Sequence, residues 1–392
     1  NSEGKKWTKL AGLPTIAIYD LDIQQRECDL VAASFGRGFY VLDDYSPLRQ
    51  LSKEVLEKKA YMFPTKEALL YIPSDPLGLE GTGFQGHNLW SADNRSFGAV
   101  FTLHQKEVGE TKKSVRQEKE KALEKEKKDV FYPTFEELRA ENSQEQAKLI
   151  WSIRGVDGKE VSRFTTTPTK GISRTVWNLR SNPISSLSGG QNGFLVPEGT
   201  YQLAVVQWEN GTIDTLIKNH TFSVKALKNQ TLFAAQPESL QQFRNEVGET
   251  SRKVKAVSEM VGELDSQLST LKEVLLNYPN ADLNLLKNVK AMKAGLDTCK
   301  RILYGDDLLA KHEFEVPPSL RSRLDMVEYM LYDNTAGVSA THRSNLSMVK
   351  EEYNEVYNRV KILWVALMNL EDQLTSLNIP YTKFRGLKWK LD

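Results

Sequence analysis

The 392-residue chain has few of the side chains from which metal and redox sites are built. Its only cysteines, Cys28 and Cys299, are far apart and fall in different predicted domains, so neither a structural disulfide nor a cysteine-ligated zinc site is expected. Its five histidines show neither the His-x-His nor the His-x-x-x-His spacing that places two imidazoles on one metal ion. A P-loop, a Gly-x-Gly-x-x-Gly fingerprint and a Gly-x-Ser-x-Gly elbow are also missing. We therefore predict no metal site and no cofactor.

An excess of charge of one sign and long apolar runs are missing as well. The chain has 52 Lys and Arg residues against 51 Asp and Glu residues, and its formal net charge is +1. Such a balance gives no electrostatic reason to expect a nucleic acid or an anionic membrane as partner. No apolar run approaches the ~18 residues that a membrane helix needs. We expect no nucleic-acid partner and no membrane span.

The most informative stretch runs from Leu30 to Leu51 and reads LVAASFGRGFYVLDDYSPLRQL. It contains two short apolar runs of strand type, Leu30–Ala33 and Phe39–Leu42, separated by a turn with Gly36 and Gly38. Glycine suits a turn of this kind because it adopts positive φ without steric cost. The pattern predicts two adjacent strands joined by a glycine-flanked turn.

The segment DLVAASFGRGFYVLDD (29–44), followed by SPLR (46–49), resembles the part of large bacterial sortilin-like proteins with BNR-type repeats that closes their β-propeller. The resemblance is weaker, in order and composition, over the rest of the chain. It implies that residues 1–51 form the terminal propeller blade, in which Arg37 and Tyr40 would face the channel or the rim. It also implies an extracellular, periplasmic or outer-surface location.

Four strand-type runs in residues 5–50 agree with one four-stranded blade. They are Trp7–Leu10, Ile16–Ile23, Leu30–Ser34 and Phe39–Leu42. One blade cannot bury its own faces, because propellers are built from several repeats that stack on one another. We therefore expect upstream propeller sequence before Asn1, and the chain would then be a fragment of a larger protein.

Residues 52–64 are expected to be a linker, and residues 65–230 a β-sandwich. Short strand-type runs separated by Gly-rich turns are typical of sandwiches. The succession around Trp177, with the Pro-x-Gly-x-Tyr turn that ends at Tyr201, resembles Ig-like sandwiches of the flagellar hook-cap type. That resemblance implies that Trp177 is buried in the core and that the turn opens a late strand. Modules of this type usually serve as spacers or interaction domains.

Residues 105–148 interrupt the sandwich with a highly charged insert. Its centre reads KKSVRQEKEKALEKEKKD, in which Glu and Lys fall three and four residues apart, as in an exposed helix. Pro133 breaks the pattern, and Thr134 is the expected N-cap of a second helix. The insert is expected to be a helical hairpin, and a disordered segment is the alternative.

From Pro237 onward the apolar residues step by three and four, which predicts long helices that pack side by side. The first seam is Val254, Val257, Val261, Leu264, Leu268, Leu271 and Leu275. The last is Leu346, Val349, Tyr353, Val356, Val360, Leu363, Leu367, Leu370, Leu374 and Leu377. We predict an elongated antiparallel helical bundle over residues 237–378, with long helices near 38–40 residues, or ~60 Å, at 1.5 Å per residue. The tail, residues 379–392, is expected to pack back on another domain through Phe384 and Trp389.

The predicted fold class is therefore multidomain α+β: a last propeller blade, an Ig-like β-sandwich with a charged helical insert, and a helical bundle. Asp43 and Asp44 are the nearest approach to a catalytic carboxylate pair, but adjacent strand residues point to opposite faces, so one is expected to cap a turn. A glycosidase needs two carboxylates that face each other across a gap of ~5–10 Å.

The predicted function is non-catalytic. The chain would be the scaffold and protein-interaction region of a secreted or cell-envelope β-propeller protein. It would buttress the propeller and present a helical face to a protein partner. The alternative, by analogy with BNR sialidases, is the C-terminal part of a glycoside hydrolase. Its active site would lie on the upstream propeller, and this chain would contribute at most Arg37 and Tyr40.

Overall fold

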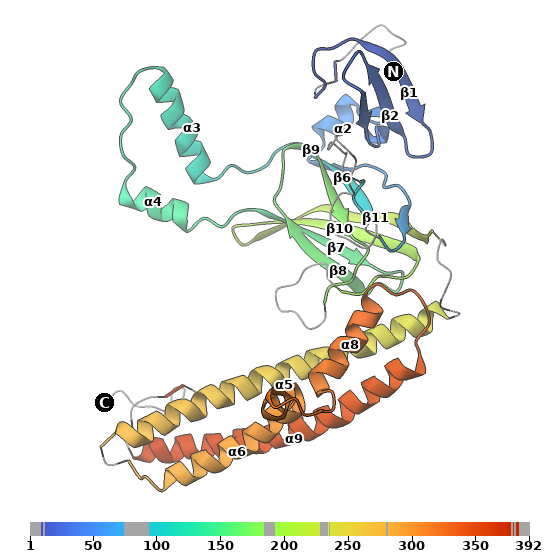
Figure 1. The fold of residues 1–392 in the computed structure, drawn as a ribbon. Helices are drawn as coiled ribbons and strands as arrows, with labels where there is room; N and C mark the ends of the chain where they lie inside the picture. The colour runs from blue at the N-terminus through green and yellow to red at the C-terminus, as the bar shows by residue number, and fades with distance from the viewer. Residues whose placement is uncertain are drawn as a thin grey trace. The chain divides into compact units, whose positions relative to one another are not determined.

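The structure is a computed structural model of mixed α+β class, about 44% helical and 24% strand, with a curled half-barrel sheet and a helical C-terminal region (Figure 1). It describes residues 9–10, 12–73, 94–183, 193–227, 234, 236–279, 281–377, 379 and 382–383. The chain forms two compact units. The first, called the sheet unit, comprises residues 1–179 and 198–227, and the second, called the helical unit, comprises residues 180–197 and 228–392.

The sheet unit begins with an antiparallel three-stranded sheet, here called the N-terminal sheet, in the order β1-β2-β3. Its strands are β1 (Ile18–Gln24), β2 (Asp29–Ser34) and β3 (Phe39–Leu42). The predicted glycine turn is confirmed, because Gly36 and Gly38 have φ of 77° and 69°. Of the fourth expected strand, Trp7–Leu10, residues 7 and 8 lie outside the described residues, and residues 9–10 are not in a strand.

Two short helices, α1 (Ser46–Arg49) and α2 (Lys53–Glu57), lead into the rest of the sheet unit. A three-stranded sheet follows, with the order β4 (Ala60–Met62), β6 (Ala99–Gln105) and β9 (Gly171–Trp177). A five-stranded sheet has the order β5 (Ala68–Leu70), β11 (Thr212–Ala226), β10 (Gly199–Glu209), β7 (Lys148–Arg154) and β8 (Glu160–Thr166). Strand β4 lies inside the predicted linker 52–64, where Tyr61 and Met62 pair with His104 and Leu103 of β6.

The sheets β4-β6-β9 and β5-β11-β10-β7-β8 bury aromatic side chains in one shared core. Phe101 of β6 meets Phe222 of β11 edge-on, with ring centroids 5.0 Å apart. Trp177 of β9 meets Tyr201 of β10 in the same way, at 5.5 Å. All four side chains are at most 5% exposed. The expectations that Trp177 is buried and that the Pro-x-Gly-x-Tyr turn opens a late strand, β10, are confirmed.

The charged insert contains two helices, α3 (Lys112–Lys125) and α4 (Phe135–Asn142). The predicted N-cap is confirmed: the Oγ1 of Thr134 accepts a hydrogen bond from the backbone N–H of Glu137, and the Glu137 carboxylate accepts one from the N–H of Thr134. Arg116 of α3 donates to Glu141 of α4 at 2.6 Å. No residue of either helix is buried, so charge pairs rather than an apolar core join them.

The helical unit consists of α5 (Pro237–Asn277), α6 (Leu285–Tyr304), α7 (Asp307–Lys311), α8 (Leu320–Tyr332) and α9 (Ala340–Ser376). Figure 1 shows α5, α6 and α9 side by side, and the helices share one apolar core. The two long helices have 41 and 37 residues, near the predicted length. The first seam is buried throughout, and the last is buried or half-buried up to Leu374. Leu377 was wrongly placed in the seam: α9 ends at Ser376, and Leu377 is 44% exposed.

The units do not follow the predicted domain limits throughout. Residues 180–197 lie within the predicted sandwich 65–230, yet they belong to the helical unit. The reason is local: Arg180 donates hydrogen bonds to the carbonyl of Tyr332 and to the side chain of Asp333, both at the end of α8.

The described start of the tail packs on the helical unit itself, not on another domain as predicted. Ile379 is fully buried in the core of that unit, and the Oγ1 of Thr382 donates to Glu371 of α9 at 2.7 Å. Phe384 and Trp389 lie outside the described residues. In the described part of the chain, no helix combines the length and the apolarity needed to cross a lipid bilayer.

Candidate functional site

The structure places Arg37 in the exposed turn between β2 and β3, and it places Tyr40, half-buried, on β3 opposite Ala32. Within the described residues, Arg37 forms no ion pair. The predicted role of Arg37 and Tyr40, at the channel or rim of a propeller, stays a prediction.

Asp43 and Asp44 serve the turn that leaves the N-terminal sheet. Asp44 has a left-handed backbone (φ 45°), and its Oδ1 accepts hydrogen bonds from the N–H and the hydroxyl of Ser46 at 3.3 and 2.6 Å. The same oxygen lies 3.3 Å from the Nζ of Lys66, whereas Asp43 lies 3.6 Å from Arg95. The expected turn cap is confirmed, and the two carboxylates pair with different cations.

Arg95 also binds the other carboxylates at this end of the N-terminal sheet. It forms ion pairs with Asp29 and with Glu27, the latter at 2.8 Å. Burial lowers the pKa of Arg95, but Asp29, Asp43 and Glu27 together raise that pKa above its ordinary value. Arg95 thus joins three carboxylates at this end of the sheet.

Both faces of the N-terminal sheet carry exposed apolar side chains. Residues that pair directly across antiparallel strands share a face, and the pairing places Leu21 and Ile23 on one face and Phe39 and Val41 on the other. These side chains are 61%, 45%, 73% and 57% exposed, respectively. An exposed apolar patch on a folded domain usually marks a surface that another protein element covers. This sheet is therefore the first candidate interaction surface of the chain.

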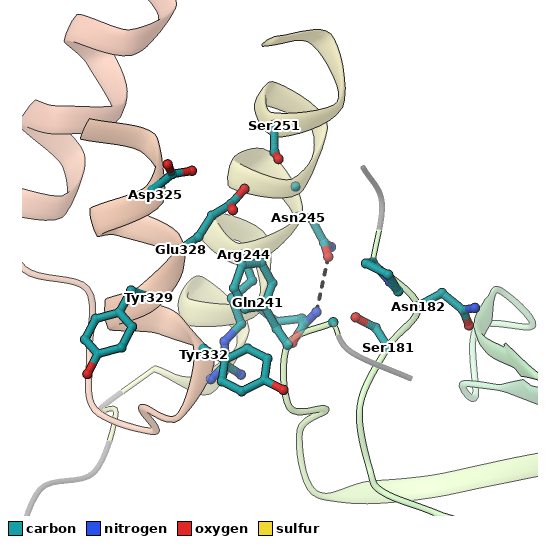
Figure 2. A pocket seen from close by; sticks show the side chains of 14 residues that line it. Ser181, Asn182, Gln241, Arg244, Asn245, Ser251, Asp325, Glu328, Tyr329 and Tyr332 are labelled. Carbon is teal, nitrogen blue, oxygen red and sulfur yellow. Dashed lines mark hydrogen bonds between the residues drawn. The ribbon is translucent and has the colours of Figure 1, made fainter. Parts of the chain in front are cut away.

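The second candidate site is a pocket of about 310 Å³ within the helical unit, here called the α5–α8 pocket (Figure 2). Its residues on each helix are spaced three or four apart, so each helix contributes one face. Helix α5 contributes Gln241, Arg244, Asn245, Gly248 and Ser251, and α8 contributes Asp325, Glu328, Tyr329 and Tyr332. Residues 181–183 and 193–194 complete the described wall.

Arg244 is a buried cation in this wall, with 4% of its surface exposed. Its Nη1 donates to the carbonyl of Leu195 at 2.8 Å, and its Nη2 donates to the carbonyls of Leu331 and Asn334. Its Nε has no hydrogen-bond partner within the described residues. Burial and the neighbouring Arg180 lower the pKa of Arg244 to about 10. Arg244 therefore binds three backbone carbonyls, one in segment 180–197 and two at the end of α8, and has one unused donor within the described residues.

Glu328 lies at the other end of the pocket and reaches from α8 towards Ser251 of α5 (Figure 2). Burial raises the pKa of Glu328, the nearby Asp325 adds to the rise, and a hydrogen bond with Ser251 and the charge of Arg321 oppose it. A third polar group, the Gln241 side chain, donates from Nε2 to the Oδ1 of Asn245 at 3.2 Å. Its Oε1 is buried and has no partner among the described residues.

The volume of the pocket, about 310 Å³, is at the lower end of the range found for ligand sites. Within the described residues, no group of three His, Cys, Asp or Glu side chains is placed to hold a metal ion. The apolar pattern does not indicate the pocket, because the predicted α5 seam begins only at Val254. Polar residues that continue the three-and-four spacing before Val254, such as Arg244 and Ser251, indicate a polar face of α5 and could have predicted the pocket.

No protein-family model matches the chain, and no curated protein matches it either.

Proposed function

We propose that this chain is the scaffold and protein-interaction region of a secreted or cell-envelope β-propeller protein, with the N-terminal sheet as the blade that closes the propeller. The observation that carries the proposal is the exposure of apolar side chains on both faces of that sheet, represented by Leu21 and Val41. A blade packs each face against a neighbouring blade, whereas an ordinary surface sheet needs only one apolar face. Further blades of the same protein are the proposed occupants of both faces.

The buttressing part of the proposal rests on contacts inside the sheet unit. Arg174 of β9 donates two hydrogen bonds to the N-terminal sheet's exit, at 2.8 Å to the carbonyl of Asp43 and 2.7 Å to that of Asp44. Lys66 and Arg95 add ion pairs to the same end of the N-terminal sheet. A blade held this way keeps a defined attachment to the following sheets. We propose that those sheets form an Ig-like sandwich, which the shared aromatic core around Trp177 supports.

The interaction part of the proposal places the partner on the helical unit. Its buried core gives a stable support, and its α5–α8 pocket is a concave surface with mixed polar and aromatic lining. Concave sites of this kind are the usual places where proteins take a ligand or a partner segment. The proposal predicts that a protein partner is recovered with the whole chain and lost when residues 237–392 are deleted. The glycoside-hydrolase alternative predicts turnover of glycosides by the propeller-containing protein.

A double substitution on one face of the N-terminal sheet, Phe39→Ser with Val41→Thr, tests the proposal. In the 392-residue chain we expect an unchanged melting temperature and weaker binding of the apolar dye ANS, since both side chains are exposed. In the propeller-containing protein we expect a loss of about 3 kcal/mol of stability, because two apolar side chains would leave a buried surface. Equal stability of parent and variant in the larger protein would contradict the proposal.

A further inference from the structure

The α5–α8 pocket of the helical unit is lined by polar groups with unused hydrogen-bonding capacity. The Nε of Arg244 is a donor without an acceptor, and the Oε1 of Gln241 is an acceptor without a donor, within the described residues. Buried polar atoms in folded proteins nearly always have a partner. Both residues line one cavity of about 310 Å³.

The two unused groups lie on the same part of α5, three residues apart. A ligand that satisfies both must offer a hydrogen-bond acceptor to Arg244 and a donor to Gln241. The backbone of one residue in an extended peptide has this arrangement, because its N–H and C=O point to the same side, as in an antiparallel ladder. A phosphate group fits less well, because it has no donor for Gln241.

The acidic end of the pocket lies further along the same helix. Ser251, which hydrogen-bonds Glu328, is seven residues from Arg244, which is about 10 Å along an α-helix. Asp325 stands one helical turn before Glu328 and lines the same pocket. Asp325 already lies 3.7 Å from Arg321, so two carboxyl groups face one cation and leave a place for a second cation at Glu328. Burial strengthens the attraction of Glu328 for that cation because solvent screens the charge less. A span of about 10 Å corresponds to three residues of extended peptide.

We propose that the α5–α8 pocket binds an extended segment of about three residues of a partner protein, with a lysine, arginine or N-terminal amine at Glu328 and Asp325, and a backbone N–H and C=O at Gln241 and Arg244. The exposed rings of Tyr329 and Tyr332 border the pocket and supply apolar contact for the peptide's side chains. The inference depends on the proposed interaction function in one respect, namely that the peptide belongs to a partner protein. The N-terminal sheet takes no part in it, so the two proposals can fail separately.

The test uses the whole 392-residue chain and two pools of N-acetylated, C-amidated tripeptides with uncharged Xaa, Lys-Xaa-Ala and Glu-Xaa-Ala, at millimolar concentration, so that only the lysine pool carries a cation. Saturation-transfer NMR detects which peptides contact the protein. We expect signals from the lysine pool that are at least fivefold stronger than those from the glutamate pool. No signal from the lysine pool, or equal signals from both pools, would overturn the proposal.

Two near-isosteric variants locate the binding. Glu328→Gln removes the charge at the acidic end, and Gln241→Met removes the unused acceptor. Each is expected to weaken the lysine-pool signal at least fivefold while circular dichroism shows an unchanged fold. Glu273→Gln, an exposed position of the same helix α5, is the matched control and is expected to bind as the parent does. Unchanged binding in both pocket variants would assign the peptide to another surface and contradict the proposal.

Discussion

The guanidinium of Arg180 lies 3.8 Å from the ring centroid of Tyr332, and it donates a hydrogen bond of 2.9 Å to the backbone carbonyl of the same residue. The two residues are 152 positions apart, and their contact holds segment 180–197 on the helical unit. The segment is also tied to α5, because Arg244 donates to the carbonyl of Leu195. Two buried arginines thus attach one loop to two helices.

Replacement of Arg180 by lysine is expected to destabilise the helical unit. Lysine keeps the charge but loses the planar fork that bonds Tyr332 and Asp333 together and stacks on the tyrosine ring. We expect a loss of about 1–3 kcal/mol, the range for hydrogen bonds to charged groups. Urea unfolding followed by circular dichroism measures it. Arg252→Lys, at an exposed position of α5, is the control, and an equal effect of both changes would contradict the assignment.

Replacement of two leucines by alanine separates the true seam of α9 from its false continuation. Leu367 is fully buried, whereas Leu377 is 44% exposed beyond the helix end, although the sequence pattern includes both. Leu367→Ala is expected to cost 2–5 kcal/mol through the lost burial and the cavity it leaves, and Leu377→Ala well under 1 kcal/mol. Equal losses in urea unfolding would show that the helix continues its buried seam through residue 377.

The capping box of α4 is expected to act locally. Thr134→Ala removes the acceptor for the N–H of Glu137 and is expected to cost the helix about 1 kcal/mol. Because no residue of α4 is buried, the change should speed hydrogen exchange in residues 135–142 by roughly fivefold and leave the melting of the rest unchanged. Thr134→Ser, which keeps the hydroxyl, is the control. A global loss of stability in the alanine variant would mean that the insert packs on another element.

Glu328 is expected to make stability depend on pH. Burial raises its pKa above the ordinary 4.5, so the folded state binds the proton more tightly than the unfolded state. Stability is therefore full below pH 4.5 and falls as the pH rises through the raised pKa of the folded protein. Glu328→Gln should raise the melting temperature by roughly 2 °C at pH 7 and leave it unchanged at pH 4. A rise of equal size at both pH values would assign the effect to packing instead of charge.

Local periodicity predicted those parts of the fold in which neighbouring residues decide the structure. The steps from Val254 to Leu275 placed the buried face of α5, and Thr134 placed the start of α4. The two glycines beside Arg37 predicted the turn between β2 and β3 for the same reason.

What the sequence did not reveal depends on residues that are distant along the chain. Strand β4 falls within the predicted linker because its three residues pair with β6, about forty positions later. The sequence does not indicate the α5–α8 pocket because Arg244 is polar. Its guanidinium can be buried because the carbonyls of Leu195, Leu331 and Asn334 accept its hydrogen bonds, and these residues are distant along the chain. Long-range pairing of this kind leaves no periodic trace.

The central claim, that the N-terminal sheet is one blade among others, is tested most directly by thiol accessibility on its two faces. Leu21→Cys and Val41→Cys are placed one at a time in a Cys28→Ser background, since Cys299 is buried. Each variant is labelled with a maleimide in the 392-residue chain and in the propeller-containing protein. Glu118→Cys, on the exposed helix α3, is the control that should label equally in both.

We predict rapid labelling of both sheet positions in the 392-residue chain, because Leu21 and Val41 are exposed there, and at least tenfold slower labelling of both in the larger protein. Protection of both positions requires a neighbour on each face, as a blade within a propeller has. Equally rapid labelling of both positions in the larger protein would contradict the account.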